Sequence, residues 1–165
     1  MYDKLTKSDI EKMKEEIDYR RTVVRKHTLE ELKAAKAQGD LSENYEYKTA
    51  KRERGRNESR IRYLDKMIKT AKIIEDHSSD DQVGLNKLVT VYFEDDDEVE
   101  TYKVTTTIRG NSIEGRVSID SPIGKALMGH KVGDRVEVKV DENTHFYVQI
   151  RDIKQGDDND EIRTY

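Results

Sequence analysis

Two carboxylates lie three residues apart in a short segment that interrupts two long charged stretches. The segment reads Gly39-Asp40-Leu41-Ser42-Glu43-Asn44, and Tyr45-Glu46-Tyr47 follows it directly. Two hard carboxylates at this spacing can share one Mg²⁺, although one or two carboxylates make a weak site without further oxygen ligands. The same spacing suits a helix N-terminus, with Asp40 as the cap and Glu43 completing a capping box. The residues alone leave both interpretations open, a helix cap and an incomplete metal site.

Other catalytic chemistry is missing from the sequence. There is no cysteine, which excludes disulfides and thiolate metal sites. The sequence has no zinc spacing, no Gly-rich phosphate loop and no serine with a histidine partner nearby, and its four histidines are scattered: His27, His77, His130 and His145. We therefore expect that the chain is not an enzyme on its own.

Two long helices are predicted to position the acidic segment. After the helix-start signal Thr6-Lys7-Ser8-Asp9, apolar residues at steps of three and four predict one helix from about Ser8 to Gln38. Arg20 and Arg21 stand where apolar residues are due in this helix. Gly39 then suits a left-handed C-cap.

The second helix has a cleaner heptad pattern. Its seam alternates steps of three and four, and the helix is predicted to end near Asp76. The seam consists of Tyr47, Ala50, Arg54, Asn57, Ile61, Leu64, Ile68 and Ala71. Two such helices joined by a short turn pack as antiparallel neighbours. We predict an antiparallel coiled-coil hairpin about 45 Å long.

The rest of the chain changes to the two-residue period of β-strands. We expect strands over residues 88–93, 99–108, 116–119, 135–140 and 146–150, with an exposed hairpin turn at 94–98. One short helix interrupts them, with Ser121 as N-cap, Pro122 as its first residue and Gly129 beyond its end. This predicts a small α+β domain, followed by an acidic tail from Gly156 that we expect to be frayed.

Charge is distributed unevenly along the chain. Charged residues make up 40% and hydrophobic residues 33% of the 165 residues, so one compact core cannot involve the whole chain. Residues 45–69 contain nine Lys/Arg and four acids, whereas residues 82–165 contain eleven Lys/Arg and seventeen acids. A basic stripe on an acidic protein suggests a specific anionic partner. A solvated helix face with i,i+4 ion pairs is the alternative.

Neither a transmembrane segment nor a signal peptide is recognisable. No apolar run is long enough to span a bilayer, and the N-terminal residues lack the apolar core of a signal peptide. We therefore expect a cytoplasmic protein that does not bind membranes.

Two separate motifs resemble those of the bacterial Gre transcript-cleavage factors, the GreA type in particular. The first is the segment 39–47 with Ala50-Lys51 behind it. The second is Ser121-Pro122-Ile123-Gly124-Lys125-Ala126-Leu127-Met128-Gly129, with Gly133-Asp134-Arg135-Val136-Glu137-Val138 after it. The resemblance covers residues 5–154. It implies an α+β fold of two domains: a coiled-coil arm (1–78) with an acidic tip (39–45), and an FKBP-like antiparallel sheet with one short helix (79–156). The acidic tail (157–165) lies beyond the resemblance.

The resemblance also implies a function. The C-terminal domain would dock on RNA polymerase through Asp120, Ser121, Pro122 and Ile123, which we call the docking loop. The arm would enter the secondary channel and stimulate cleavage of the nascent RNA 3′ end in backtracked complexes. Asp40 and Glu43 would complete a Mg²⁺ site that the polymerase supplies. RNA contacts would be made by Tyr45, Lys48, Lys51, Arg52, Arg54 and Arg56, whereas packing is favoured for Tyr47. We expect a monomer that binds no metal tightly when isolated.

Two other functions stay open at this stage. Some relatives bind the polymerase channel and regulate initiation or pausing without cleavage, although the presence of Asp40 and Glu43 favours cleavage. The second alternative function is that of a coiled-coil adaptor, in which the tip acids only cap a helix. The basic run 51–56 is more typical of the GreB type, so the preferred fragment length is open. Within that run, Gly55 is expected to cost about 1 kcal/mol of helix stability relative to Ala.

Overall fold

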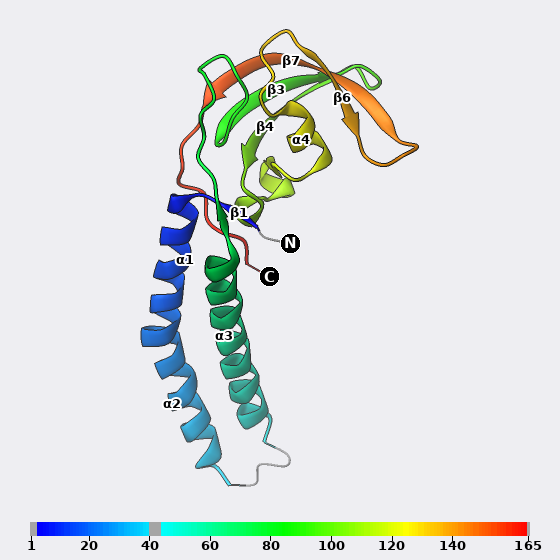
Figure 1. Ribbon diagram of the computed structural model, residues 1–165. Coiled ribbons are helices and arrows are strands. Elements are labelled where there is room, and N and C mark those ends of the chain that lie inside the picture. Colours follow the sequence, from blue (N-terminus) through cyan, green and yellow to red (C-terminus); the bar gives the residue numbers. More distant parts are fainter. Residues whose placement is uncertain (1–2, 40–43, 165) are drawn as a thin grey trace. The chain divides into compact units, whose positions relative to one another are not determined.

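The computed structural model describes residues 3–39 and 44–164. Its contacts divide the chain into two compact units, one formed by Ile10–Ala71 and the other by Lys4–Asp9 with the chain from Lys72 onward. We call them the arm and the sheet unit. The predicted fold class is confirmed, because the arm is a helical hairpin and the sheet unit combines a five-stranded sheet with one short helix (Figure 1). The proposed boundaries at residues 78 and 156 stay predictions.

The first helical run of the hairpin has three parts. They are α1 (Lys7–Tyr19), the π-helical turn η1 (Arg20–Val24) and α2 (Arg25–Lys36). The predicted extent is nearly right, but the π-helical turn falls where Arg20 and Arg21 interrupt the apolar seam. A π-helical turn accommodates one more residue than an α-helical turn. It therefore resets which side chains of this run face the returning helix.

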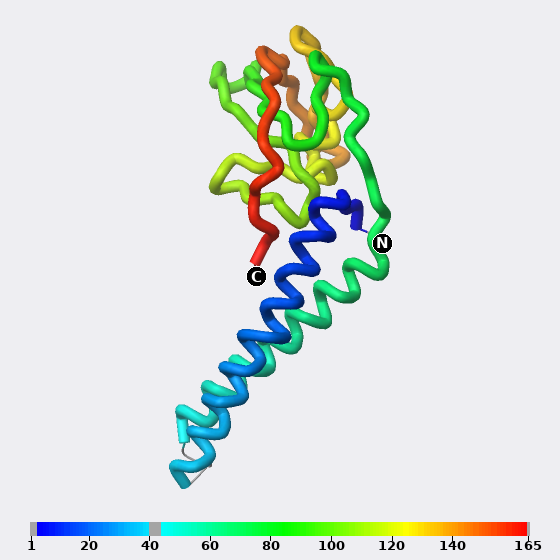
Figure 2. Tube along the Cα trace, turned by 90° about the vertical axis from the view of Figure 1, so that its left-hand side faces the viewer, coloured from blue at the N-terminus to red at the C-terminus, as the bar shows by residue number. Residues whose placement is uncertain are grey.

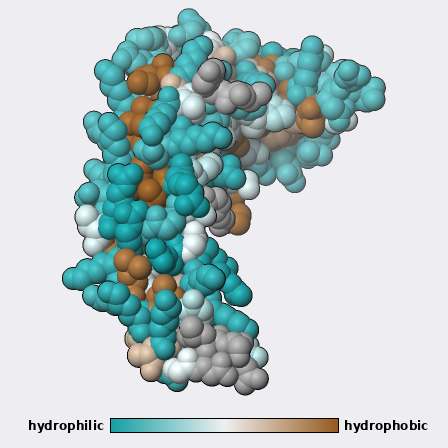
Figure 3. All heavy atoms as spheres, turned by 60° about the horizontal axis from the view of Figure 1, so that its bottom comes forward, coloured by the Kyte–Doolittle hydropathy of each residue, from teal (hydrophilic) through white to brown (hydrophobic). Residues whose placement is uncertain are grey.

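The returning helix, α3 (Tyr45–Thr70), packs antiparallel to α2, and Figure 2 shows the two runs crossing. It ends at Thr70 rather than near Asp76, because Lys72–Ile73 (β2) pairs in parallel with Lys4–Leu5 (β1). Its seam also differs from the predicted heptad: Arg54 is exposed, and Met67 is buried more fully than Ile68. The arm surface seen in Figure 3 is mostly hydrophilic, as expected for helices that each bury one narrow stripe.

A buried polar cluster replaces the apolar seam at the middle of the arm. The Glu16 carboxylate accepts hydrogen bonds from Arg20 Nε at 2.9 Å and from Arg60 Nε at 2.8 Å. Arg20 also donates to Asn57 Oδ1 at 3.2 Å, and Asn57 Nδ2 donates back to the Arg20 carbonyl oxygen at 3.2 Å. Burial raises the pKa of Glu16, but the hydrogen bonds and charges of Arg60 and Arg20 outweigh it and leave this pKa below its usual value. The cluster explains why Arg20 interrupts the apolar pattern.

The sheet of the second unit has the strand order β5-β4-β3-β7-β6. The strands are β3 (Lys87–Phe93), β4 (Glu98–Thr105), β5 (Arg116–Ser118), β6 (Arg135–Lys139) and β7 (His145–Gln155). Neighbouring strands are antiparallel except β5, which runs parallel to β4. The sheet is therefore mixed, whereas an antiparallel one was predicted. Its core is almost entirely aliphatic, with fully buried residues that include Val89, Val91, Val104, Val138 and Val148.

The other differences between the predicted and the observed structure lie in short helical turns and in the tail. The strand predicted to reach residue 108 stops at Thr105, and the 3₁₀ turns η2 (Thr107–Arg109) and η3 (Ser112–Glu114) follow. The helix α4 (Pro122–Leu127) has the predicted N-cap Ser121, and Leu127 lies in the core. The acidic tail is not frayed, because the backbone N–H of Arg163 donates to the Ile108 carbonyl oxygen at 2.6 Å and tail carboxylates form ion pairs. None of the described helices has the length and apolar character of a membrane span.

Candidate functional site

The described residues nearest the acidic tip are Gly39 and Asn44; Asp40 and Glu43 lie outside the described residues. Gly39 follows α2 with φ +108°, and an added Cβ would meet nothing within 4 Å. Backbone conformation rather than space therefore favours glycine here. The predicted left-handed residue at the end of the first helical run is confirmed, although the C-cap itself is Ala37.

Asn44 fixes the start of α3 and connects it to the end of α2. Its Oδ1 accepts the backbone N–H of Tyr47 at 3.0 Å, which makes it the N-cap. Its Nδ2 donates to the Ala35 carbonyl oxygen, four residues before Gly39, at 2.8 Å. Of the two interpretations left open, capping of this helix by Asp40 with Glu43 in a capping box does not hold, because Asn44 is the N-cap and α3 begins at Tyr45. The preference of asparagine for the N-cap was the signal that sequence reasoning missed.

The donor chemistry of the tip fits Mg²⁺ as a partial ligand set. Asp40 and Glu43 offer hard carboxylate oxygens, the ligands that Mg²⁺ prefers. The neighbouring oxygen of Asn44 is already engaged by the Tyr47 N–H. Across residues 3–39 and 44–164, no group of three His, Cys, Asp or Glu is arranged to hold a metal ion.

The first turns of α3 present an exposed basic face. The side chain of Tyr45 is 80% exposed, and Lys48 Nζ lies 5.6 Å from the centre of the Tyr45 ring. Lys48, Lys51 and Arg52 are exposed at i, i+3 and i+4, so they share one side of the helix. Within the described chain these three residues form no ion pair. The arrangement suits an anionic, partly aromatic ligand such as single-stranded nucleic acid.

Two further basic residues predicted to contact RNA, Arg54 and Arg56, differ from these three. Arg56 donates to Glu53 Oε1 at 3.0 Å, so its charge is partly compensated. Arg54 lies on another side of the helix by spacing, near Glu58. The pKa of Glu58 is lowered mainly by its hydrogen bond from Arg25 and to a smaller extent by the charge of Arg54. By spacing, Arg54 is therefore separated from Lys48, Lys51 and Arg52, whereas Arg56 shares their side of the helix but is paired with Glu53.

A small groove between α2 and α3 lies next to this face and was not foreseen from the sequence. It has a volume of about 440 Å³ and is lined by Ala34, Ala35 and Ala50 beside the ring of Tyr45, with Glu31, Glu46 and Thr49 completing it. Three small alanine side chains at facing helix positions leave this space, and their presence in the sequence was the signal that could have predicted the groove.

The docking loop is hydrogen-bonded to β5 and η2 of the sheet unit. Ser121 Oγ accepts the Gly124 N–H at 3.1 Å and donates to the Ser118 carbonyl oxygen at 2.6 Å. Asp120 accepts a hydrogen bond from Thr107 Oγ1 at 3.1 Å. An added Cβ on Gly124 would lie only 1.9 Å from the Ser118 carbonyl oxygen. Close backbone approach therefore requires glycine at position 124 of the second motif.

Comparisons with known proteins match both units. Residues 4–73 match the family model described as transcription elongation factor, N-terminal, and residues 78–155 match the model described as transcription elongation factor, GreA/GreB, C-term. The chain is 46% identical over 136 residues to transcription elongation factor GreA of Geobacillus kaustophilus, covering 82% of this chain and 86% of that protein. It is 42% identical over 135 residues to GreA of Bacillus subtilis, with the same coverages.

Solved structures with similarity to this chain include GreA factor homolog 1 (Gfh1) of Thermus thermophilus. That comparison has 25% sequence identity and a TM-score of 0.43, and it covers 93% of this chain and 99% of the other. The family assignment rests on the sequence matches, which extend through the arm and the sheet unit. With both family models matched in order, the chain belongs to the GreA/GreB family of transcription elongation factors.

Proposed function

We propose that this transcription elongation factor binds RNA polymerase, inserts its arm into the secondary channel and stimulates cleavage of the RNA 3′ end in backtracked complexes. Asp40 and Glu43 complete the ligand shell of a Mg²⁺ ion held in the polymerase active site. The sheet unit docks on the polymerase through Asp120, Ser121, Pro122 and Ile123. The factor has no catalytic centre of its own and acts by completing that of its partner.

The observation that carries the proposal is the capping of α3 by Asn44. An adaptor needs the tip acids only as helix caps, and that role is filled by another residue. Asp40 and Glu43, three residues apart in the sequence, are then not needed as the N-cap of α3. Their chemistry suits a divalent cation whose other ligands come from the partner.

The chemistry divides between the two proteins. When bound, the Mg²⁺ ion activates a water for attack on a phosphodiester and stabilises the leaving oxygen. Asp40 and Glu43 contribute negative oxygens at the end of the arm. Lys48, Lys51 and Arg52 offer cations to the phosphates of the extruded RNA, and the exposed ring of Tyr45 offers a stacking surface. None of these roles requires a substrate pocket in this chain.

The experiment adds the purified factor to backtracked elongation complexes assembled with RNA labelled at either end. The proposal predicts short 3′ fragments, a shortened 5′-labelled transcript and restart of elongation when nucleotides are added. Binding to the complexes without fragments would instead favour a channel-binding regulator of initiation or pausing. Absence of binding would contradict both functions.

A further inference from the structure

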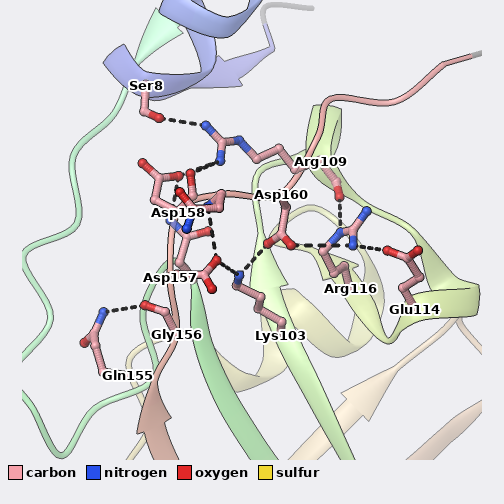
Figure 4. Close-up of polar contacts among 12 residues, drawn as sticks. Ser8, Lys103, Arg109, Glu114, Arg116, Gln155, Gly156, Asp157, Asp158 and Asp160 are labelled. Carbon is pink, nitrogen blue, oxygen red and sulfur yellow. Dashed lines mark hydrogen bonds and ion pairs between the residues drawn. The ribbon is translucent and has the colours of Figure 1, made fainter.

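The acidic tail (residues 156–164) occupies a site lined by three cations of the sheet unit (Figure 4). We call Lys103 of β4, Arg109 of η2 and Arg116 of β5 the cationic site. Asp158 Oδ1 accepts from Arg109 Nη1 at 2.5 Å, and the Asp158 carbonyl oxygen accepts from the same nitrogen at 3.0 Å. Asp160 lies 2.5 Å from Lys103 Nζ and 3.6 Å from Arg116 Nη1.

The cationic site is built into the fold. The Arg109 side chain is only 1% exposed, with its Nε 2.5 Å from Asp9 Oδ1 and its Nη2 2.8 Å from Ser8 Oγ. Arg116 Nε donates to the Arg109 carbonyl oxygen at 2.9 Å. These contacts hold two guanidinium groups in place independently of the tail. Their positions are therefore fixed before a carboxylate arrives.

Lys103 depends on the tail for its counter-charge. Its side chain is 11% exposed, and its ion pairs within the described chain go to Asp157 at 3.3 Å and to Asp160. The two aspartates are three residues apart, so one extended segment supplies both carboxylates. A nearly buried ammonium group is costly without a partner. The site therefore demands anionic occupancy, and the tail satisfies it.

The backbone path of the tail is fixed at Gly156, whereas the residues after it contact the sheet unit mainly through ion pairs. An added Cβ on Gly156 would lie 2.2 Å from the Asn86 carbonyl oxygen, so the chain leaves β7 along a track that only glycine fits. Beyond it, residues 156–164 pair with no strand of the described sheet. Their backbone contact with the neighbouring turn is the bond from Arg163 N–H to the Ile108 carbonyl oxygen. The side chains of Asp157 and Asp158 are 66% and 47% exposed, so salt screens their ion pairs, and another acidic segment can compete with the tail for these cations.

The tail also borders the docking loop. A groove of about 810 Å³ is lined by Asp160, Ile162 and Thr164 of the tail together with Arg116, Ser121 and Ile123. Ile113, which also lines the groove, is 96% exposed. The matched family domain ends at residue 155, so the tail is an addition to the part that the family model describes. A partner that docks at Ser121 and Ile123 meets the tail in the same groove.

We propose that Lys103, Arg109 and Arg116 form a binding site for an extended acidic peptide segment with carboxylates three residues apart, and that the tail is its internal competitor. The external ligand is an acidic segment of the partner that docks beside the docking loop. This partner is RNA polymerase if the proposed function is correct. Release of the tail then uncovers both the cations and the groove, and strengthens docking.

The first experiment tests the site without polymerase. A fluorescent peptide of residues 156–165 is titrated into the parent chain, a chain truncated after Gln155, and the full chain carrying Asp157→Asn and Asp160→Asn. Both altered chains should bind the peptide at least tenfold more tightly than the parent. Adding Lys103→Gln and Arg116→Gln to either should remove that binding, as should a peptide with asparagine at positions 157 and 160.

The double aspartate variant keeps the test decisive if the truncated chain does not fold. A folded variant that binds the peptide no better than the parent would overturn the internal-competitor proposal. Binding that survives loss of Lys103 and Arg116 charge would overturn the assignment of the site. Asp95→Asn with Asp96→Asn, which removes the same charge from an exposed turn, is the matched control and should behave like the parent.

The second experiment measures the affinity of the same full-length chains for polymerase. The variant with Asp157→Asn and Asp160→Asn should bind several-fold more tightly than the parent, with the difference shrinking as salt rises. Equal affinities would contradict competition between the tail and polymerase. A parent chain that does not bind polymerase at all contradicts the proposed function instead, while the peptide experiment still tests the cationic site by itself.

Discussion

The side chain of Asn44 joins the two helical runs of the arm by donating to the Ala35 carbonyl oxygen at 2.8 Å while its own oxygen caps α3. One side chain thus satisfies a free N–H at the start of one helix and adds a second kind of donor to a carbonyl at the end of the other, which also accepts the backbone N–H of Gln38 at 3.3 Å. Both ends of the acidic segment are held near each other as a result. The spacing between Gly39 and Asn44 is a property of the hairpin itself.

This double role makes a specific prediction for two substitutions of Asn44. Asn44→Asp keeps an oxygen for the Tyr47 N–H but removes the donor to Ala35, whereas Asn44→Ala removes both. We expect Asn44→Ala to lower the free energy of unfolding by about 1–2 kcal/mol and Asn44→Asp to lower it less. Both should reduce transcript cleavage, which we would measure alongside urea unfolding. Full cleavage by Asn44→Ala would show that the bridge does not position the tip.

Much of the arm could be predicted from the sequence, but its polar interior could not. Heptad spacing indicated the hairpin, and glycine at position 39 indicated the end of the first run. The heptad spacing of α3 placed Arg54 on the seam, although its side chain is exposed. Spacing also does not reveal that Arg60 forms an ion pair with Glu16 across the hairpin. The two-residue pairing of β1 with β2 is too short to leave a periodic signal, so α3 was predicted to extend too far.

In the candidate site, too, features set by neighbouring residues could be predicted from the sequence, whereas contacts between residues far apart in the sequence could not. The caps Ser121 and Pro122 are local signals and were predicted correctly. Capping by Asp40 was one of two open interpretations because acids favour helix N-termini, but Asn44, directly before the helix, is the N-cap. The tail was expected to fray because its composition is polar. Its binding depends on Lys103, Arg109 and Arg116, which lie about fifty residues earlier in the chain and are brought together only by the folded sheet.

The exposed basic face of α3 predicts a salt-dependent interaction with RNA. We expect Lys51→Gln with Arg52→Gln to reduce the rate of cleavage several-fold at moderate salt. The slope of the logarithm of affinity for the backtracked complex against the logarithm of salt concentration should fall by about 0.7 for each phosphate that the variant no longer neutralises. Lys66→Gln with Lys69→Gln, on the same helix but far from the tip, is the control. An identical slope for parent and tip variant would exclude phosphate binding by these residues.

Two glycines should respond in opposite ways to alanine. Gly55 is exposed in α3 with nothing near an added Cβ, so Gly55→Ala should raise the free energy of unfolding by about 1 kcal/mol. Gly124→Ala forces its Cβ into the Ser118 carbonyl oxygen and should destabilise the sheet unit and displace the docking loop. Chemical denaturation and polymerase binding measure the two effects. A neutral Gly124→Ala would mean that the docking loop tolerates a different backbone path.

The polar cluster of the arm makes a prediction about pH. Because the pKa of Glu16 is lowered in the folded chain, its contribution to stability is complete above the unfolded value of about 4.3 and is lost as pH falls through the folded pKa. Glu16→Gln should therefore cost about 2 kcal/mol at neutral pH, and the difference from the parent should disappear in acid.

Unfolding of parent and Glu16→Gln by urea across this pH range measures the effect. Glu53→Gln, which removes an exposed carboxylate paired with Arg56, should cost less than about 1 kcal/mol at any pH. A difference between parent and Glu16→Gln that does not change with pH would mean that the charge of Glu16 does not stabilise the arm.

The central claim is that the tip carboxylates supply chemistry rather than helix capping. Transcript cleavage by Asp40→Asn in backtracked complexes tests it most directly, since asparagine caps helices as well as aspartate does. The proposal predicts unchanged unfolding, unchanged affinity for polymerase and abolished cleavage, with Glu43→Gln behaving alike. Cleavage by Asp40→Asn at the rate of the parent chain would contradict it.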